Sequence, residues 1–214
     1  MKGKLILIRH QESRWNKLGF WTGLRDIILT EDGCKKAEEV GLFLKKYMSD
    51  NAISSIDNAF ASMEVRSIET LALILNSCEL YNVPTKHAAE LNERDYGDYT
   101  GKDKWQMEKE LGEDEFQKVR RGWDKVPPNG ESLEMVYNRS VPYFQKEVLP
   151  LLDQGKNVLI VAHGNSLRSL LKYIENISNE DIANIEFAFN EFVVFDLGNE
   201  GKSIKKDLQM MYLA

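Results

Sequence analysis

The sequence has few cysteines and no long hydrophobic run. Its 214 residues include only two cysteines, Cys34 and Cys78, which lie far apart and form no Cys-x-x-Cys pair. This usage excludes a disulfide framework and a cysteine-ligated zinc site. We therefore expect both thiols to be small core or helix-surface residues. No segment approaches the roughly 18 uninterrupted apolar residues of a membrane helix, so the sequence predicts no membrane-spanning segment.

The sequence also lacks an excess of basic residues and a recognisable targeting segment. It has 28 Lys and Arg against 34 Asp and Glu, a formal charge of −6, which excludes a generally basic nucleic-acid binder. The first apolar run, residues 5–8, has four residues, which is shorter than the core of a signal peptide. We therefore expect a cytoplasmic protein.

Length and composition are sufficient for one hydrophobic core. Hydrophobic residues make up 43% and charged residues 29% of the chain, as is ordinary for a globular protein. A chain of this size buries roughly 70% of its surface on folding. We expect residues 1–214 to form a single domain.

Strand and helix patterns alternate along the chain and predict an α/β sandwich. Continuous apolar runs predict buried strands at 5–8 and 158–162, with further strands at 192–195, weakly at 55–62, and at the edge in the last dozen residues. Helical spacing predicts helices at 31–48, with Thr30 as N-cap, and at 64–78, 131–153 and 166–174. The sequence also predicts exposed helices within residues 102–125, an irregular stretch at 81–100 and a bend at Pro142.

Two of the three histidines directly follow the two clearest strands. His10 ends the first strand and His163 ends the strand at 158–162. Ligands of open α/β sheets bind beyond the carboxyl ends of the strands. Either histidine alone could be an ordinary loop residue. Together with Arg9 and a helix start near Asn165, which offers free backbone N–H groups, they favour an anion site. We interpret the third, His87, as a surface or packing residue.

Several longer motifs follow these histidines in a fixed order. They are Arg9-His10-Gln11-Glu12-Ser13-Arg14-Trp15-Asn16, Trp21-Thr22-Gly23, Arg66-Ser67-Ile68-Glu69-Thr70, the block from Leu91 to Lys104, Arg120-Arg121, and Ala162-His163-Gly164-Asn165-Ser166-Leu167-Arg168. From about residue 4 to 197 the sequence closely resembles the cofactor-dependent phosphoglycerate mutases of the histidine phosphatase superfamily. The resemblance implies a three-layer α/β/α sandwich with a mostly parallel central sheet and an antiparallel edge strand.

The resemblance also implies an activity. It is the interconversion of 3-phosphoglycerate and 2-phosphoglycerate in glycolysis and gluconeogenesis, an isomerase reaction primed by 2,3-bisphosphoglycerate and independent of metal. His10 would become phosphohistidine and Glu93 would be the general acid/base. To donate a proton, Glu93 would need desolvation or nearby anions that favour its protonated form.

The remaining site residues follow from the same resemblance. Arg9, Arg66 and the catalytic His163 would surround the transferred phosphoryl group. The residues expected to hold the carboxylate and the distal phosphate of the substrate are Arg94, Tyr96, Lys104, Arg120 and Arg121. Neutral hydrogen bonds would come from Ser13, Asn16, Thr22 and Gly23, and from the backbone of Gly164 and Asn165. We interpret Trp15 and Trp21 as loop-packing aromatics and Lys102 as solvated.

The sequence departs from the family pattern at Gln11, where the family usually has glycine. Gln11 could introduce strain, change the pocket wall or donate a hydrogen bond to phosphate. The segment between Trp123 and Glu131 is shorter than in the longer mutases, and the C-terminal tail is also short. Family members are often dimers, so the resemblance allows a homodimer.

Two other functions compete with the mutase. A phosphomonoester hydrolase would use the same phosphohistidine but release the phosphoryl group to water. A non-enzymatic phosphate-ligand sensor is the reading that Gln11 suggests. The cationic residues at 94, 104, 120 and 121 favour a doubly charged ligand that carries a carboxylate, which argues for the mutase.

Overall fold

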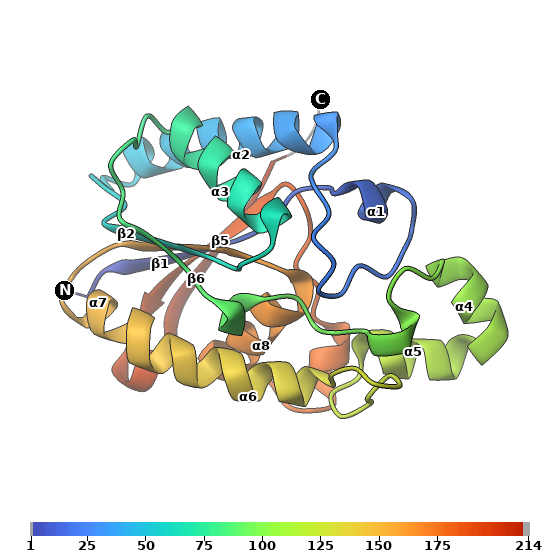
Figure 1. Ribbon diagram of the computed structural model, residues 1–214. Helices are drawn as coiled ribbons and strands as arrows, with labels where there is room; N and C mark the ends of the chain where they lie inside the picture. The colour runs from blue at the N-terminus through green and yellow to red at the C-terminus, as the bar shows by residue number, and fades with distance from the viewer. Residues whose placement is uncertain (1, 212–214) are drawn as a thin grey trace.

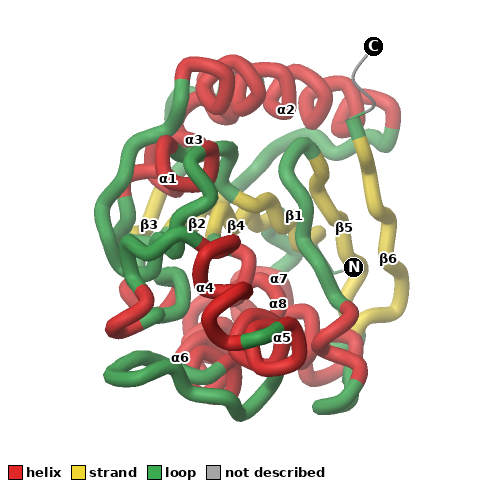
Figure 2. The backbone as a smooth tube through the Cα atoms, turned by 90° about the vertical axis from the view of Figure 1, so that its right-hand side faces the viewer, coloured by secondary structure: helices red, strands yellow, loops and turns green. Residues whose placement is uncertain are grey.

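The computed structural model describes residues 2–211 and is built around a six-stranded sheet. The strands are β1 (Lys4–Arg9), β2 (Asn58–Ala61), β3 (Thr85–His87), β4 (Val158–Ala162), β5 (Glu191–Leu197) and β6 (Ser203–Met210). They lie in the order β3-β2-β4-β1-β5-β6 (Figure 2). Strands β3, β2, β4 and β1 are parallel, whereas β5 runs antiparallel to both β1 and β6.

Helices cover both faces of this sheet. Helices α2 (Glu31–Asp50) and α3 (Val65–Ser77) lie on one face, and α6 (Leu133–Tyr143), α7 (Leu149–Asp153) and α8 (Gly164–Glu175) lie on the other (Figure 1). The predicted three-layer sandwich with a mostly parallel sheet is therefore confirmed. The central strands β1 and β4 are buried on both faces, which explains why their sequences are continuously apolar rather than alternating.

The register of β1 and β4 positions the two histidines. Leu5 pairs with Val158 and Arg9 pairs with Ala162, so the two parallel strands end at the same level. The backbone N–H of His10 continues the ladder by donating to the carbonyl oxygen of Ala162 at 2.9 Å. The residues that follow the two strands therefore emerge side by side.

Several local predictions hold at the level of single residues. The Thr30 side chain accepts a hydrogen bond from the N–H of Gly33 and caps α2, as its position predicted. Helix α6 ends at Tyr143, directly after Pro142, and a π-helical segment, Phe144–Val148, leads into α7. This change agrees with the predicted bend, because proline cannot donate the helical hydrogen bond. Cys78 is buried and Cys34 is partly buried on α2, as expected.

Two short elements were missed by the sequence interpretation. Strand β3 lies in the stretch expected to be irregular, and α1 (Arg14–Lys17) lies in the loop after His10. Strand β3 has three exposed residues, and α1 has four residues held by a capping box between Ser13 and Asn16. Elements this short carry no hydrophobic period, so only their neighbours in space define them.

A small helical unit lies beyond the carboxyl ends of the strands. Helices α4 (Lys104–Leu111) and α5 (Glu113–Arg121) stand in front of the sheet in Figure 2. Trp21 and Tyr96 from two loops pack there against Phe116, with ring centroids 4.3 Å apart for Trp21–Tyr96 and 5.7 Å for Trp21–Phe116. This apolar cluster holds α4 and α5 over the strand ends.

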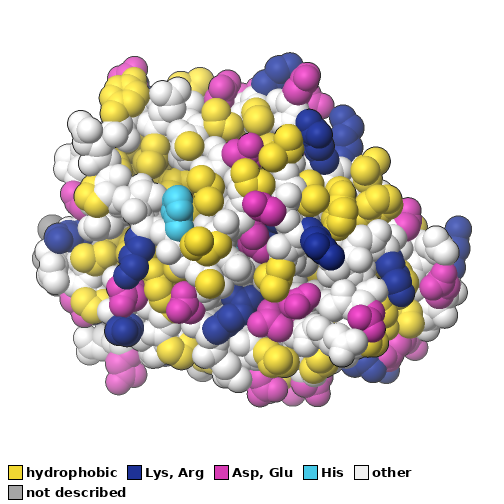
Figure 3. All heavy atoms as spheres, viewed as in Figure 1, with side chains coloured by type: hydrophobic (Ala, Val, Ile, Leu, Met, Phe, Trp, Pro, Cys, Tyr) yellow, Lys and Arg dark blue, Asp and Glu magenta, His cyan; other side chains and the backbone are white. Residues whose placement is uncertain are grey.

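On the face of the molecule that Figure 3 shows, acidic and basic side chains are interspersed without a large region of one sign. His87 is exposed on β3, as expected, and so is Lys102. Within residues 2–211, no helix is long and apolar enough to cross a membrane. Residues 212–214, the end of the tail that the sequence interpretation called short, lie outside the described residues.

The close packing of α2 against α3 depends on Gly41. A Cβ at this position would lie 2.7 Å from the Cβ of Ser77 and 2.9 Å from the carbonyl oxygen of Ile74. We expect Gly41→Val to separate α2 from α3 and lower the free energy of unfolding by about 1–3 kcal/mol, measured by urea denaturation. The control Leu42→Ala, at an exposed neighbour, should change it by less than about 0.5 kcal/mol. Equal effects of the two variants would contradict this assignment.

Candidate active site

The ends of β1 and β4 bring His10 and His163 into contact. Their ring centroids are 4.8 Å apart, and both side chains are buried, with 2% and 0% exposure. The paired strand ends therefore place the two predicted histidines in one site.

His10 is held as a neutral ring with one nitrogen free. Its Nδ1 lies 2.7 Å from the carbonyl oxygen of Gln11, and a carbonyl can only accept, so Nδ1 carries the proton. Burial, followed by the charges of His163 and Arg66, lowers the pKa of His10 well below its usual value. The unprotonated Nε2 is thus available as a nucleophile at neutral pH.

His163 is held through its Nε2 atom. Ser62 Oγ lies 2.7 Å from Nε2, and a carboxylate oxygen of Glu64 also contacts Nε2. Burial lowers the pKa of His163, whereas the Glu64 carboxylate acts to raise it. Although burial tends to raise the pKa of Glu64, His163 and Arg66 lower it to about 2, so this carboxylate is ionised.

Glu93 is fixed by donors on one of its carboxylate oxygens. Oε1 accepts from the N–H of Arg94 at 2.7 Å and from the side-chain amide of Asn165 at 3.0 Å. Burial tends to raise the pKa of Glu93, but His163 and the Arg94 N–H lower it below its usual value. This direction is opposite to the one expected for a proton donor. The protein's own groups therefore hold Glu93 ionised, ready to accept a proton first.

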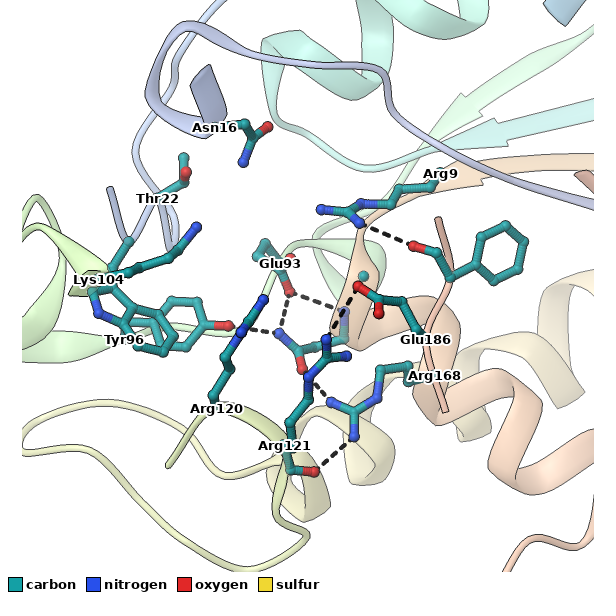
Figure 4. A pocket seen from close by; sticks show the side chains of 14 residues that line it. Arg9, Asn16, Thr22, Glu93, Tyr96, Lys104, Arg120, Arg121, Arg168 and Glu186 are labelled. Atoms are coloured by element: carbon teal, nitrogen blue, oxygen red, sulfur yellow. Dashed lines mark hydrogen bonds and ion pairs between the residues drawn. The ribbon is translucent and has the colours of Figure 1, made fainter. Parts of the chain in front are cut away.

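A cationic cavity opens beside Glu93 (Figure 4). The volume of this cavity is about 100 Å³. Five cationic and two acidic side chains line it together with polar and aromatic residues: Arg9, Asn16, Trp21, Thr22, Glu93, Tyr96, Lys104, Arg120, Arg121, Gly164, Asn165, Arg168, Glu186 and Phe187. Burial, then the charges of Arg120 and Arg9, lowers the pKa of Lys104 to about 8.

Buried polar atoms in this wall have no hydrogen-bond partner among the described residues. They are Arg9 Nε, Trp21 Nε1, Thr22 Oγ1 and Arg168 Nε, three of them obligatory donors. Arg9 is otherwise held by Phe187, whose carbonyl oxygen accepts from its guanidinium at 2.9 Å, and by the Phe189 ring, which lies 4.0 Å from Arg9 Cζ. Unpartnered donors beside an excess of positive charge suit a ligand with several anionic oxygens.

Comparisons with known proteins decide the family. The model of the histidine phosphatase superfamily (branch 1) matches residues 5–207. This chain belongs to that superfamily.

Curated relatives within the superfamily are phosphoglycerate mutases. The chain is 38% identical to the 2,3-bisphosphoglycerate-dependent phosphoglycerate mutase of Buchnera aphidicola, over 95% of this chain and 97% of the relative. It is 39% identical to the phosphoglycerate mutase of Schizosaccharomyces pombe, over 95% and 94%. The family resemblance of the motifs is thereby confirmed.

Solved structures of two phosphatases share the fold. A mycobacterial glucosyl-3-phosphoglycerate phosphatase superposes with a TM-score of 0.78 at 19% identity, covering 98% of each chain. An alpha-ribazole phosphatase from Shigella flexneri gives a TM-score of 0.76 at 22% identity, covering 97% of this chain and 95% of the other. These likenesses concern the fold alone.

Some of the predicted site residues lie behind the cavity wall rather than on it. Arg66 donates to the carbonyl oxygens of Arg25 at 2.8 Å and Gly23 at 3.0 Å. Arg94 is fully buried and donates to the carbonyl oxygen of Val119 at 2.6 Å, which ties it to α5. Each guanidinium group is thus bound to the main chain through some of its nitrogens, whereas Arg66 Nε and Arg94 Nε and Nη1 have no hydrogen-bond partner among the described residues.

Ser13 and Gly23 also lie behind the wall and shape the loop after His10. The Ser13 hydroxyl donates to the Asn16 amide oxygen at 2.8 Å and so orients a residue that does line the cavity. Gly23 has a φ of +52°, and a Cβ there would lie 2.8 Å from Thr100 Oγ1. Only glycine fits this turn without strain.

The sequence interpretation missed Arg168, Glu186 and Phe187 as wall residues. Arg168 follows Asn165 by one helical turn and donates to its amide oxygen at 3.0 Å, a spacing that could have indicated it. Glu186 pairs with Arg121 at 3.1 Å, but no pattern in residues 176–190 signals this. We expected Trp21 to pack a loop. It packs against Tyr96 and Phe116 and also lines the cavity.

Gln11 links the nucleophile segment to the loop that holds Arg9. Its side-chain amide donates to the carbonyl oxygen of Arg9 at 3.1 Å, and its amide oxygen accepts from the N–H of Asn190 at 3.3 Å. The φ angle of Gln11 is not positive, so its backbone carries no left-handed strain. One of the two N–H donors of its side-chain amide is thus used within the protein, and Gln11 is not among the residues that line the cavity.

The Gln11 link predicts a local change in hydrogen exchange. In Gln11→Ala the N–H of Asn190 loses its acceptor, and we expect its exchange to become about fivefold faster, as for the loss of ~1 kcal/mol. The N–H of Ala188 donates to Glu191 at 2.8 Å and serves as the control, since this bond is untouched. Unchanged exchange at Asn190, measured by NMR, would contradict the link.

Proposed function

We propose that this chain interconverts 3-phosphoglycerate and 2-phosphoglycerate through a phosphohistidine at His10. One observation carries the proposal: the neutral, buried imidazole of His10 directly follows Arg9, one of the five cationic side chains that line the cavity. Its curated relatives bear the name of this activity and cover nearly the whole chain. A phosphate and a carboxylate on one small substrate match such a cavity better than a single phosphate would.

The residues present fit 2,3-bisphosphoglycerate, which the names of the relatives imply as cofactor. The unpartnered donors Arg9 Nε and Trp21 Nε1 and the charges of Lys104, Arg120 and Arg121 supply contacts for two phosphates and a carboxylate. When bound, this compound supplies the phosphoryl group that primes His10.

The chain's own groups divide the chemistry between them. His10 Nε2 attacks phosphorus, and Arg9, Arg66 and His163 stabilise negative charge on the phosphoryl oxygens. Glu93 accepts the proton of the attacking substrate hydroxyl and returns one to the departing oxygen, a role worth roughly 10² to 10⁴ in rate. Asn165 holds Glu93 and Tyr96 together, because its side-chain amide donates to both, at 3.0 and 2.9 Å.

Arg94 has a different place in this proposal from the one its motif suggested. Its bonds to α5 support the position of Arg120 and Arg121, which do line the cavity. We propose that it acts on the substrate through these residues. We also propose a cytoplasmic protein of one domain that binds no nucleic acid. A homodimer is compatible with these proposals, and a mass measurement in solution tests it.

The decisive experiment labels His10. We expect incubation with 2,3-bisphosphoglycerate labelled in its phosphates to give acid-labile phosphate on His10, and a chase with 3-phosphoglycerate to give 2-phosphoglycerate. His10→Ala should abolish labelling, whereas His87→Ala, a change at the exposed histidine, should leave it intact. Activity should also survive EDTA.

The competing functions give different results in the same experiment. Release of free phosphate in place of 2-phosphoglycerate would show a phosphomonoester hydrolase. Absence of label on His10 would exclude both enzymes and leave a phosphate-ligand sensor.

The lowered pKa of Lys104 predicts a pH dependence of substrate capture. As the pH rises through about 8, the ammonium loses its proton and one cationic contact disappears. Because kcat/KM reports groups of the free enzyme, we expect it to fall about tenfold above this pH. Lys104→Arg should keep its charge and remove that step, whereas Lys102→Arg, at an exposed position, should not. Identical profiles for the wild type and Lys104→Arg would refute the prediction.

A further inference from the structure

Glu64 is a buried carboxylate that the proposed mechanism does not yet use. Its side chain is 4% exposed. It occupies the N-cap position of α3, but its side chain makes no capping hydrogen bond there. An ionised carboxylate is costly to bury unless it is paired. Its partners therefore indicate its purpose.

Both partners of one Glu64 oxygen belong to the proposed catalytic set. Oε2 contacts Nε2 of His163 and accepts from the backbone N–H of Glu93 at 3.1 Å. The other oxygen, Oε1, lies 3.5 Å from a guanidinium nitrogen of Arg66. One carboxylate thus touches His163, Glu93 and Arg66.

The contact with Glu64 decides which nitrogen of His163 carries a proton. An ionised carboxylate only accepts hydrogen bonds, so Nε2 must be the protonated nitrogen. The opposite nitrogen, Nδ1, is buried and has no partner among the described residues. The His163 ring lies against His10, where the phosphoryl group is expected. In the neutral ring Nδ1 carries a lone pair in place of a hydrogen, so it cannot donate a hydrogen bond to a phosphoryl oxygen.

The charges around His163 oppose one another. Arg66, from α3, and burial disfavour the doubly protonated ring, whereas Glu64 and Glu93 favour it. His10, from the end of β1, is itself neutral. Glu64 is the only one of the two carboxylates in direct contact with the ring. Removing its charge would leave the His163 cation facing Arg66 in a buried site.

We propose that Glu64 is a positioning residue that fixes the Nε2–H form of His163 and stabilises its doubly protonated state. In that state Nδ1–H donates to the phosphoryl group on His10. The proton on Nδ1 comes from solvent when the anion binds, and no bond to carbon or phosphorus changes in this step. The functional part of this inference rests on the proposed phosphoryl transfer at His10.

Glu64→Gln tests the charge while keeping the shape. The amide oxygen can still accept from Nε2–H and from the Glu93 N–H, whereas the NH2 group replaces Oε1, so the charge and the ion pair with Arg66 are lost. An opposite charge in direct contact shifts a pKa by roughly 1–3 units. Glu64 raises the pKa of His163, so its loss lowers it. In a plot of kcat against pH, the alkaline limb is the fall of kcat at high pH. We therefore expect this limb to move to lower pH by about one unit or more.

Two matched variants separate charge from structure. Glu64→Asp keeps the charge and should restore most of the alkaline limb. Ser62→Ala removes the uncharged neighbour of Nε2, which lies 2.7 Å away, and should move the limb by less than about 0.3 units. A Glu64→Gln enzyme whose kcat falls equally at every pH would show a merely structural role and overturn the proposal.

The tautomer can be measured without any activity. In the wild-type protein without substrate, ¹⁵N NMR of the histidine rings should show the proton of His163 on Nε2, and His163 should titrate at lower pH in Glu64→Gln. A ring protonated on Nδ1 alone would overturn the proposal even if Glu64→Gln failed to fold. Because His10 labelling tests phosphoryl transfer separately, failure of the proposed function and failure of this inference give different results.

Discussion

The parallel pairing of β1 with β4 is the constraint on which the site depends. The ladder aligns Arg9 with Ala162 and continues through the His10 N–H, so that two residues more than 150 positions apart in sequence meet ring to ring. Burial of both strands on both faces fixes this register. A shift by one residue would turn Arg9 or Gly164 toward the place of a histidine and reverse the faces of the strand.

The way in which the protein holds its arginines preserves their charge for a ligand. Main-chain carbonyl oxygens accept from Arg9, Arg66, Arg94 and Arg168. Carbonyls satisfy the donors of a guanidinium without neutralising it, whereas carboxylates would cancel the positive field. There are two exceptions among the arginines of the site, since Arg121 pairs with Glu186 and Arg66 also lies 3.5 Å from Glu64. An acidic protein can in this way contain a strongly cationic cavity.

Carboxylates are placed in the site where they control protons. Glu93 and Glu64 are both buried and ionised, and both receive hydrogen bonds from backbone N–H groups. Glu93 is held ready to accept a proton, and Glu64 holds His163 in one tautomer. The same environment keeps His10 neutral, because burial and then the charges of His163 and Arg66 lower its pKa. Opposite protonation preferences within one small volume are what reversible phosphoryl transfer needs.

The sequence alone determined the layers of the fold, the two strand-end histidines and the family, since long apolar periods and contiguous motifs are local properties of the chain. It also identified Thr30 as a cap and Pro142 as a bend. Only the tertiary structure decided that Arg94 and Arg66 hold main-chain carbonyls behind the wall, that Arg168 and Glu186 line the cavity, and that Glu64 touches His163. Each of these depends on where a long side chain points among residues distant in sequence. No local pattern encodes that direction, because it is set by the packing of separate elements against one another.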